Sequence, residues 1–181
     1  GGIGIFYRKN IIPDILLGDF DSVVFEHLEW AKKKFIPIME YDKNKDATDT
    51  ELALDIAIEK GYDNIIILGG IGSRLDHTIG NLHLLIHAYK KGKNAILSSP
   101  GCEARLLTPN KSLKIKKSKY NYLSILPASE SIEGITTQGL HWNMNECSIK
   151  LGSTLGISNY IESEEATIKL KNGMAFVFSV L

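Results

Sequence analysis

The sequence has 181 residues, enough for one large domain or two small ones. Apolar residues make up 44% of it, an ordinary share for a protein with a hydrophobic core. The 21 basic and 21 acidic residues give a formal net charge of zero. Because no basic excess is available to neutralise a phosphate backbone, we expect no nucleic-acid partner.

Further features of the composition narrow the class of protein. Cys102 and Cys147 lie far apart, without Cys-x-x-Cys spacing or nearby histidine pairs, so free thiols are a simpler explanation than structural zinc or a disulfide. No apolar run approaches the ~18 residues of a membrane span, and no leader segment is recognisable. We therefore expect a cytoplasmic protein without a membrane partner. The five lysines within residues 111–119 favour a solvated strand face or loop over a binding patch.

The first half of the chain is predicted to alternate strands with helices. The expected strands cover residues 11–17, 35–39, 65–68 and 95–97, and the expected helices cover residues 22–34, 48–60 and 76–91. Thr48-x-x-Glu51 is a capping-box pattern at the start of the second helix. The β-branched run at 65–68 is typical of a strand buried on both faces. This alternation predicts an α/β domain with a mainly parallel, Rossmann-like sheet.

The second half has a different pattern, because short alternating segments replace the helical periods after Pro100-Gly101. The expected strands cover residues 105–107, 113–115, 122–126, 147–151, 166–170 and 175–180. Gly and Asn turns separate them, which predicts an all-β C-terminal sandwich or small barrel. We place the domain boundary near 99–104, with an α/β domain over 1–100 and a sandwich domain over 104–181, packed together.

Two carboxylates, Asp19 and Asp21, directly follow the apolar run 15–17. In open α/β sheets ligands bind at the carboxyl ends of the strands. Neighbouring carboxylates repel each other unless a cation joins them, and Mg²⁺ on a phosphate substrate is the usual occupant. The structural alternative is a turn in which Asp21 caps the following helix. One Asp is easily explained that way, but the pair favours a metal site.

A second acidic cluster lies at residues 45–51, where the helix 48–60 is predicted to start. Thr48, Asp49 and Glu51 all suit the first turn of a helix and its dipole, so capping alone is slightly favoured here. Asp46 lies outside that turn and gains less from it. Because the cluster follows a strand, it would bring more carboxylate oxygens to the same sheet edge.

A third cluster, at residues 69–77, combines glycines with Arg74, Asp76 and His77 directly after the strand 65–68. Glycines let the backbone approach a phosphate, and a helix N-terminus offers free N–H groups to an anion. Arg74 has a donor fork suited to phosphate, and Asp76 could bind metal or accept a proton. The alternative is a glycine turn with Asp76 as the helix N-cap and His77 on the surface. Together, the three clusters favour phosphoryl or pyrophosphoryl transfer.

These clusters, taken together, resemble the thiamine pyrophosphokinase family. The matching segments are Gly18-Asp19-Phe20-Asp21-Ser22, Asp46-x-Thr48-Asp49-x-Glu51-x-Ala53-Leu54, Gly69-Gly70-x-x-x-Arg74-x-Asp76-His77-x-x-x-Asn81, Gly139-Leu140-x-Trp142 and Gly156-Ile157-Ser158-Asn159. The resemblance implies transfer of a diphosphate from ATP to the hydroxyl of thiamine, giving thiamine diphosphate and AMP. It also implies Mg²⁺ and a homodimer with thiamine at the subunit interface.

The resemblance also implies roles for single residues. Mg²⁺ and the ATP phosphates would be held by Asp19, Asp21, Asp46 and Asp49, with Thr48, Gly70, Arg74, His77 and Asn81 also at ATP. Asp21, Asp49, Arg74 and Asp76 would be the catalytic group. Thiamine would contact Trp142, Ser158 and Asn159, with Ser153 as a weaker candidate. For Trp142, a place in the sandwich core is an equally good interpretation, although cation–π attraction suits the thiazolium ring.

One difference from the family concerns the start of the sequence. The family begins with a strand and an Asp-Gly-Gly turn, whereas this sequence opens at Gly1-Gly2. We therefore expect one strand of ~5–6 residues and its Asp to be missing, which affects ATP binding at that edge. Two other functions remain open: a phosphatase with an Asp-x-Asp nucleophile, and a thiamine- or nucleotide-binding module without turnover.

Overall fold

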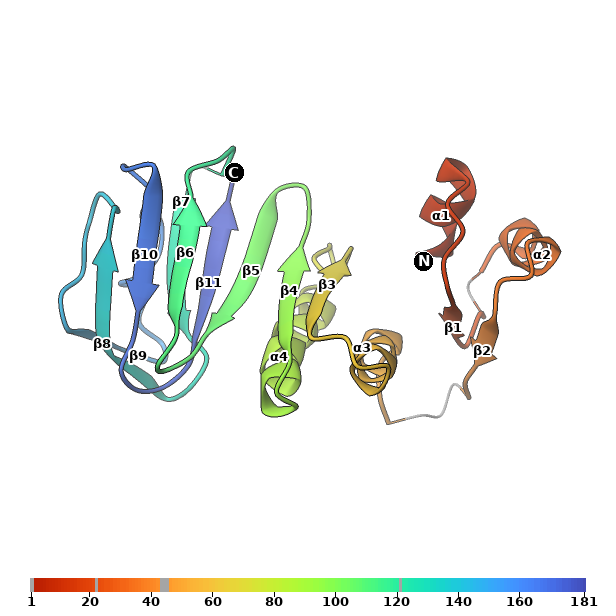
Figure 1. Ribbon diagram of the computed structural model, residues 1–181, viewed down its shortest axis with the longest axis horizontal. Coiled ribbons are helices and arrows are strands. Elements are labelled where there is room, and N and C mark those ends of the chain that lie inside the picture. The colour runs from red at the N-terminus through yellow and green to blue at the C-terminus, as the bar shows by residue number, and fades with distance from the viewer. Residues whose placement is uncertain (1, 22, 43–45, 121) are drawn as a thin grey trace. The chain divides into compact units, whose positions relative to one another are not determined.

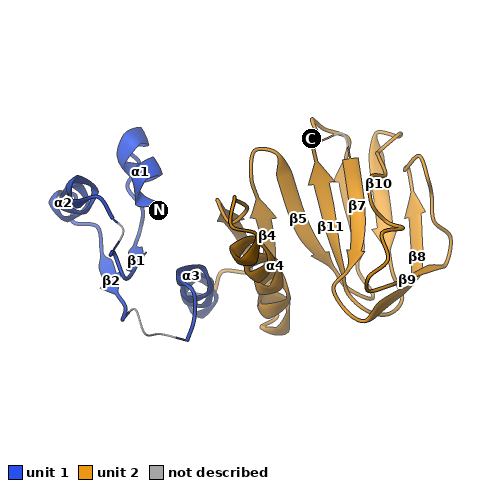
Figure 2. Ribbon diagram, turned by 180° about the vertical axis from the view of Figure 1, so that it is seen from behind, with its two compact units in different colours: residues 1–60 blue, residues 61–181 orange. Residues whose placement is uncertain are grey.

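The computed structural model describes residues 2–21, 23–42, 46–120 and 122–181 (Figure 1). It divides into two compact units, Gly1–Lys60 and Gly61–Leu181, which are described separately below (Figure 2). Four helices and eleven strands are found in the described ranges. None of the described helices has the length and apolar character needed to cross a bilayer. Cys102 and Cys147 are free thiols, as predicted.

The first unit is a small α/β arrangement around one parallel strand pair. Its elements are α1 (Ile3–Lys9), β1 (Leu16–Gly18), α2 (Phe25–Lys33), β2 (Ile38–Glu40) and α3 (Asp49–Glu59). Strands β1 and β2 pair in parallel, with Leu16 opposite Ile38. Ile3, Leu16, Ala31 and Ile36 form its buried cluster. The paired strands place the segments that follow Gly18 and Glu40 at the same end of this sheet.

Three elements in this unit have bounds that differ from the prediction, among them the strand expected over 35–39, which is found at Ile38–Glu40. The strand expected over 11–17 is confined to Leu16–Gly18, because Ile11 and Ile12 are more than half exposed and cannot supply a core face. The helix expected from residue 22 begins at Phe25, with Val24 in the N-cap position. Asp21 is therefore not the cap of this helix, and that structural alternative is wrong. Ser22 lies outside the described residues.

The second unit holds one helix and two sheets. Its elements are β3 (Asn64–Leu68), α4 (Leu75–Lys90), β4 (Asn94–Ser98), β5 (Cys102–Leu107), β6 (Ser112–Lys116), β7 (Tyr122–Pro127), β8 (Ser131–Gln138), β9 (Cys147–Lys150), β10 (Glu165–Lys169) and β11 (Ala175–Val180). The sheet orders are β3-β4-β5-β11-β7 and β6-β10-β8-β9. Among the named strands of this unit only β3 and β4 pair in parallel.

The strand pairs found within residues 1–100, β1–β2 and β3–β4, are parallel as expected, but the five-stranded sheet is mixed, so a mainly parallel, Rossmann-like sheet is not confirmed. The parallel pair β3–β4 continues into the antiparallel strands β5, β11 and β7 because β4 pairs antiparallel with β5. The chain passes from β4 to β5 through a short turn, in which Ser99 N–H donates to the Cys102 carbonyl at 2.8 Å. The division into domains 1–100 and 104–181 stays a prediction.

Strand β3 pairs with β4 within the second unit. In this unit Ile66 is 63% exposed and Leu68 is 76% exposed, whereas Ile65 and Ile67 are half-buried. The apolar run at 65–68 is therefore a strand, as predicted, and its burial on both faces stays a prediction.

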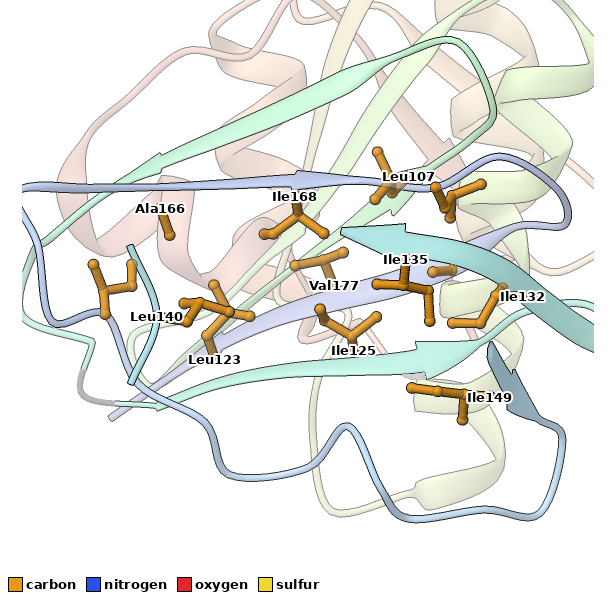
Figure 3. Close-up of a cluster of buried hydrophobic side chains, with 13 residues drawn as sticks. Leu107, Leu123, Ile125, Ile132, Ile135, Leu140, Ile149, Ala166, Ile168 and Val177 are labelled. Atoms are coloured by element: carbon orange, nitrogen blue, oxygen red, sulfur yellow. The ribbon is translucent and has the colours of Figure 1, made fainter. Parts of the chain in front are cut away.

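The β-rich part of the second unit is a sandwich, as its alternating segments predicted. Figure 3 shows Leu123, Ile125 and Val177 of one sheet facing Ile135 and Ile168 of the other, and all five are fully buried. Successive strand residues point to opposite faces, so these inward positions leave every second residue outside. Full burial of each such aliphatic side chain stabilises the fold by about 1.5–3 kcal/mol.

Candidate active site

The carboxylates of the first unit gather where β1 ends. Gly18 has a φ of +147°, and a Cβ placed there would lie 3.1 Å from Oδ2 of Asp49. The first residue of α3 therefore lies directly beside the end of β1. Asp19 and Asp21 follow in the next turn, where the Asp21 N–H donates to Oδ1 of Asp19 at 3.3 Å. The predicted meeting of the first two acidic clusters is thus found within this unit.

Thr48 serves as a helix cap. Its Oγ1 accepts a hydrogen bond from the Glu51 N–H at 3.2 Å, which confirms the capping-box prediction for the start of α3. Asp49 and Glu51 occupy the first turn, where the helix dipole favours a negative charge. Asp46 is exposed, in a bend just before this helix. Lys45 lies outside the described residues.

The donor set at this end of β1 suits a hard cation. Carboxylate oxygens are the ligands that Mg²⁺ takes, usually one or two at a time together with water and substrate phosphate. Among the described residues, no group of three or more His, Cys, Asp or Glu side chains lies close enough to hold a metal ion without further oxygens. The residues present therefore fit a magnesium ion whose ligands come partly from these carboxylates and partly from a substrate phosphate and water. The assignment of Asp19, Asp21, Asp46 and Asp49 as its ligands stays a prediction.

The glycine-rich loop of the second unit is held tightly at Gly70. A Cβ there would lie 2.5 Å from Cδ1 of Leu97, so a larger residue at this position would force the buried Leu97 side chain to shift. Asn81, only 8% exposed, donates from Nδ2 to the Gly70 carbonyl at 2.8 Å. The Gly72 N–H donates to Oγ1 of Thr78 at 3.2 Å. The amide of Asn81 therefore fixes the loop, which is a structural role that its motif did not reveal.

Helix α4 begins immediately after this loop. Arg74 occupies its N-cap position, so the expectation that Asp76 would cap the helix is wrong. Instead, Nη2 of Arg74 lies 2.6 Å from Oδ2 of Asp76, and Nε lies 3.3 Å from Oδ1. This bond with Arg74, helped by the His77 N–H, holds the pKa of Asp76 below its usual range. Both side chains are exposed, as is His77, so the pair is open to exchange with an anion.

The sandwich carries an exposed aromatic cluster around Trp142. Trp142 is 59% exposed, so its predicted alternative place in the sandwich core is wrong. His141 stacks on Tyr160 with ring centroids 4.6 Å apart. The Trp142 ring meets His141 edge-to-face at 4.6 Å and Tyr160 at 5.5 Å. His141 and Tyr160 contact the predicted tryptophan, and no periodic pattern in the sequence would have identified them.

Asn159 holds the backbone of this cluster. Its side chain is 5% exposed, and its Oδ1 accepts from the Trp142 N–H at 3.1 Å and from the Tyr160 N–H at 2.9 Å. Its Nδ2 donates to the Trp142 carbonyl at 2.7 Å. Both ends of the amide are thus engaged with backbone. The geometry makes Asn159 a support for Trp142.

The two serines predicted to contact thiamine, Ser158 and Ser153, differ in how accessible their hydroxyl groups are. Ser158 is exposed and has a φ of +64°, and its N–H donates to Oγ of Ser124 at 3.1 Å. Ser153 is half-buried, and its Oγ accepts from the Leu155 N–H at 3.3 Å. Ser158 therefore presents its side chain outward from a strained backbone position, whereas the Ser153 hydroxyl is partly used within its own turn.

Comparison with known proteins agrees with these arrangements. Residues 1–97 match the family model "Thiamin pyrophosphokinase, catalytic domain", and residues 110–175 match "Thiamin pyrophosphokinase, vitamin B1 binding domain". The chain is 35% identical to the thiamine pyrophosphokinase of Bacillus subtilis, over 91% of this chain and 77% of that protein. Thiamine pyrophosphokinase 1 of Oryza sativa is 26% identical, over 96% and 68% of the two chains.

Solved structures are similar over nearly the full length of the chain. The crystal structure of the Bacillus subtilis thiamine pyrophosphokinase superposes with a TM-score of 0.91 at 32% identity, covering 99% of this chain and 84% of that one. The structure from Geobacillus thermodenitrificans gives a TM-score of 0.88 at 27% identity, covering 99% and 83%. The chain therefore belongs to the thiamine pyrophosphokinase family.

Proposed function

We propose that this protein transfers a diphosphate group from ATP to the hydroxyl of thiamine, giving thiamine diphosphate and AMP. The observation that carries the proposal is that both halves of the chain match the two domains of one enzyme family, in order. The acidic and glycine-rich segments, which are the chemically distinctive parts of the sequence, lie at strand ends in the matched catalytic region. Positioning and charge neutralisation supply most of the rate in such transfers.

In this proposal the end of β1 in the first unit and the glycine-rich loop in the second unit are each phosphate-binding elements. Asp19, Asp21, Asp46 and Asp49 are the proposed ligands of Mg²⁺, which when bound would neutralise charge on the triphosphate. The position of Asp49 beside Gly18 supports a shared role with the first two aspartates. Thr48 and His77 sit at helix N-termini, where N–H groups favour anions.

Arg74 and Asp76 are the proposed pair at the transferred group. Arg74 exchanges Asp76 for a phosphate oxygen, because its fork binds phosphate and carboxylate with the same geometry. Asp76 is ionised at neutral pH, since its pKa is lowered by Arg74. Loss of that partner raises its affinity for a proton, which suits a base that takes the proton from the attacking thiamine hydroxyl. AMP leaves as the hydroxyl oxygen bonds to the β-phosphorus.

The thiamine end of the site is proposed to lie at Trp142. Its exposed indole offers a face to a cationic ring, and cation–π attraction is strongest for tryptophan. Asn159 acts through Trp142 by fixing its peptide group, while Ser158 and, more weakly, Ser153 are the proposed polar contacts. His141 and Tyr160, stacked on each other, both meet the indole edge-to-face and restrict its orientation.

A homodimer with thiamine at the subunit interface is part of the proposal. The connection between β9 and β10 carries Ser158 and exposes Leu151 at 67%, Leu155 at 66% and Ile157 at 45%. Exposed apolar side chains clustered in one segment are typical of an interface. Sedimentation should show a dimer that Leu155→Lys weakens; a monomer for the parent protein would remove this part of the proposal.

One incubation tests the reaction against its two rivals. With ATP, Mg²⁺ and thiamine, formation of AMP and thiamine diphosphate supports the transferase. Phosphate release without thiamine favours the phosphatase, and tight binding without product favours the binding module. Asp21→Asn should abolish turnover with an unchanged unfolding midpoint, because the side chain is exposed. Near-normal turnover of this variant would remove Asp21 from the metal site.

A further inference from the structure

A cleft of ≈570 Å³ opens on the outer face of the four-stranded sheet, the face opposite the sandwich core. Its walls come from the start of β6, the middle of β8 and the end of β10. None of the residues that we assign to ATP, Mg²⁺ or thiamine lines it. The volume is in the range of small-ligand sites, and larger than a single phosphate group requires.

The centre of the cleft is a row of three polar side chains across three strands. Lys169 of β10 lies opposite Ser112 of β6 on one side and opposite Thr136 of β8 on the other. Residues in such register point to the same face, with Cβ atoms about 4.5–5.5 Å apart. Strand register therefore places the base of the Lys169 side chain between those of Ser112 and Thr136, and this placement does not depend on a loop conformation.

The charges around this row leave an excess of positive charge. Lys171 and Glu146 pair with each other at 2.5 Å, and this bond lowers the pKa of Glu146. In the part of the chain that the structure describes, Lys169 forms no salt bridge, and Nζ of Lys111 lies 5.8 Å from the centre of the Tyr89 ring. Two of the three lysines in the cleft thus have no carboxylate partner.

The glycine in the cleft wall explains how Lys171 is held. Gly134 has a φ of +65°, and a Cβ there would lie 2.6 Å from Cγ of Lys171. The stem of Lys171 occupies the space of the missing side chain, so its charge is fixed at the rim beside Glu146. Consequently Lys169 and Lys111 are the cations that remain available to a ligand.

We propose that this cleft binds a phosphate dianion, either free or carried by a small phosphomonoester. The two lysines without a carboxylate partner match the charge of such a group, and the hydroxyl of Ser112 beside Lys169 is a further donor. The Thr136 hydroxyl donates to Oε1 of Glu146 at 3.3 Å and so helps to hold that carboxylate beside Lys171. The proposal goes beyond the diphosphotransferase activity and does not depend on it. It also gives Lys111, the first of the five clustered lysines, an anionic partner in addition to the ring of Tyr89.

The test is a titration of the ¹⁵N-labelled protein with inorganic phosphate, and separately with AMP, at constant ionic strength. We expect saturable shifts of the amide signals of Ser112, Thr136 and Lys169, and a loss of affinity of about tenfold in Lys169→Gln. Lys150→Gln is the matched control, because Lys150 is exposed on β9 of the same sheet and does not line the cleft. Lys169→Arg should retain binding.

The comparison of inorganic phosphate with AMP distinguishes a free phosphate ion from a phosphomonoester as the ligand of the cleft. Tighter binding of AMP than of phosphate at these three amides identifies a phosphomonoester as the preferred ligand, and equal binding identifies the free anion. The proposal is overturned if neither ligand gives saturable shifts there, or if Lys150→Gln loses as much affinity as Lys169→Gln. Shifts confined to residues 69–78 would report on the catalytic loop alone and would also overturn it.

Discussion

Replacing Asn159 by alanine tests whether this residue supports Trp142 or contacts thiamine. The substitution removes three hydrogen bonds, two to the Trp142 peptide groups and one to the Tyr160 N–H. At about 1 kcal/mol for each hydrogen bond, we expect the free energy of unfolding to fall by about 3 kcal/mol. Because Asn159 is buried, water cannot easily replace the lost partners.

The measurement is urea unfolding in a Trp30→Phe background, where Trp142 is the remaining tryptophan and its fluorescence reports on the second unit. Asn172→Ala is the matched control, since that side chain is exposed and makes one long bond, 3.3 Å, to Glu133. We expect less than about 0.5 kcal/mol from the control.

A direct thiamine contact gives the opposite pattern. If Asn159→Ala weakened thiamine binding while its unfolding free energy matched that of Asn172→Ala, the positioning argument would be refuted. A support role instead requires that Asn159→Ala lowers the free energy of unfolding more than Asn172→Ala does. It also requires that thiamine affinity falls together with the loss of a fixed orientation of the Trp142 ring. The intensity of the near-UV circular dichroism of Trp142 reports that order without any ligand.

Three further predictions follow from the site. Trp142→Ala should weaken thiamine binding more than ATP binding without unfolding the protein, because the ring is exposed; equal losses for both ligands in calorimetry would argue against it. Gly70→Ala should lower the unfolding free energy by about 1–3 kcal/mol, since its Cβ would overlap Leu97, and an unchanged urea midpoint would contradict this. Carboxyl NMR should place the pKa of Asp76 below its usual value, and Arg74→Gln should raise that pKa. Because the pKa of Asp76 is lowered in the folded state, the ion pair stabilises the fold at neutral pH, and this stabilisation is lost as the pH falls through the lowered pKa.

The helices show what local sequence can predict. The capping box at Thr48 correctly located α3, because a cap and its first turn are encoded within four residues. Helix α1 has no side-chain cap and only seven residues, so it carries too little local signal to be predicted. Strand β8 was missed for a similar reason. Gly134 and a register shift between Ile132 and Ile135 interrupt its alternation.

Strand pairing was harder to predict than strand location. The apolar run of β3 correctly indicated a strand, and its partner β4 was also expected as a strand. Strand β5 turns back directly after β4 and pairs with it antiparallel, and it also pairs with β11. Because β11 lies far away from β5 in sequence, periodicity could not predict that the parallel pair continues into a mixed sheet.

Two asparagines show that a motif residue can also support the backbone of a site. Asn81 and Asn159 both lie in segments that resemble the family, and both were predicted to contact a ligand, which stays a prediction. In the structure each is buried and donates its amide to a backbone carbonyl, of Gly70 in one case and Trp142 in the other. A buried amide that binds a peptide group fixes the loop that carries the neighbouring candidate contact residue. These backbone hydrogen bonds depend on burial and on contacts that a motif does not encode, so the sequence alone could not predict them.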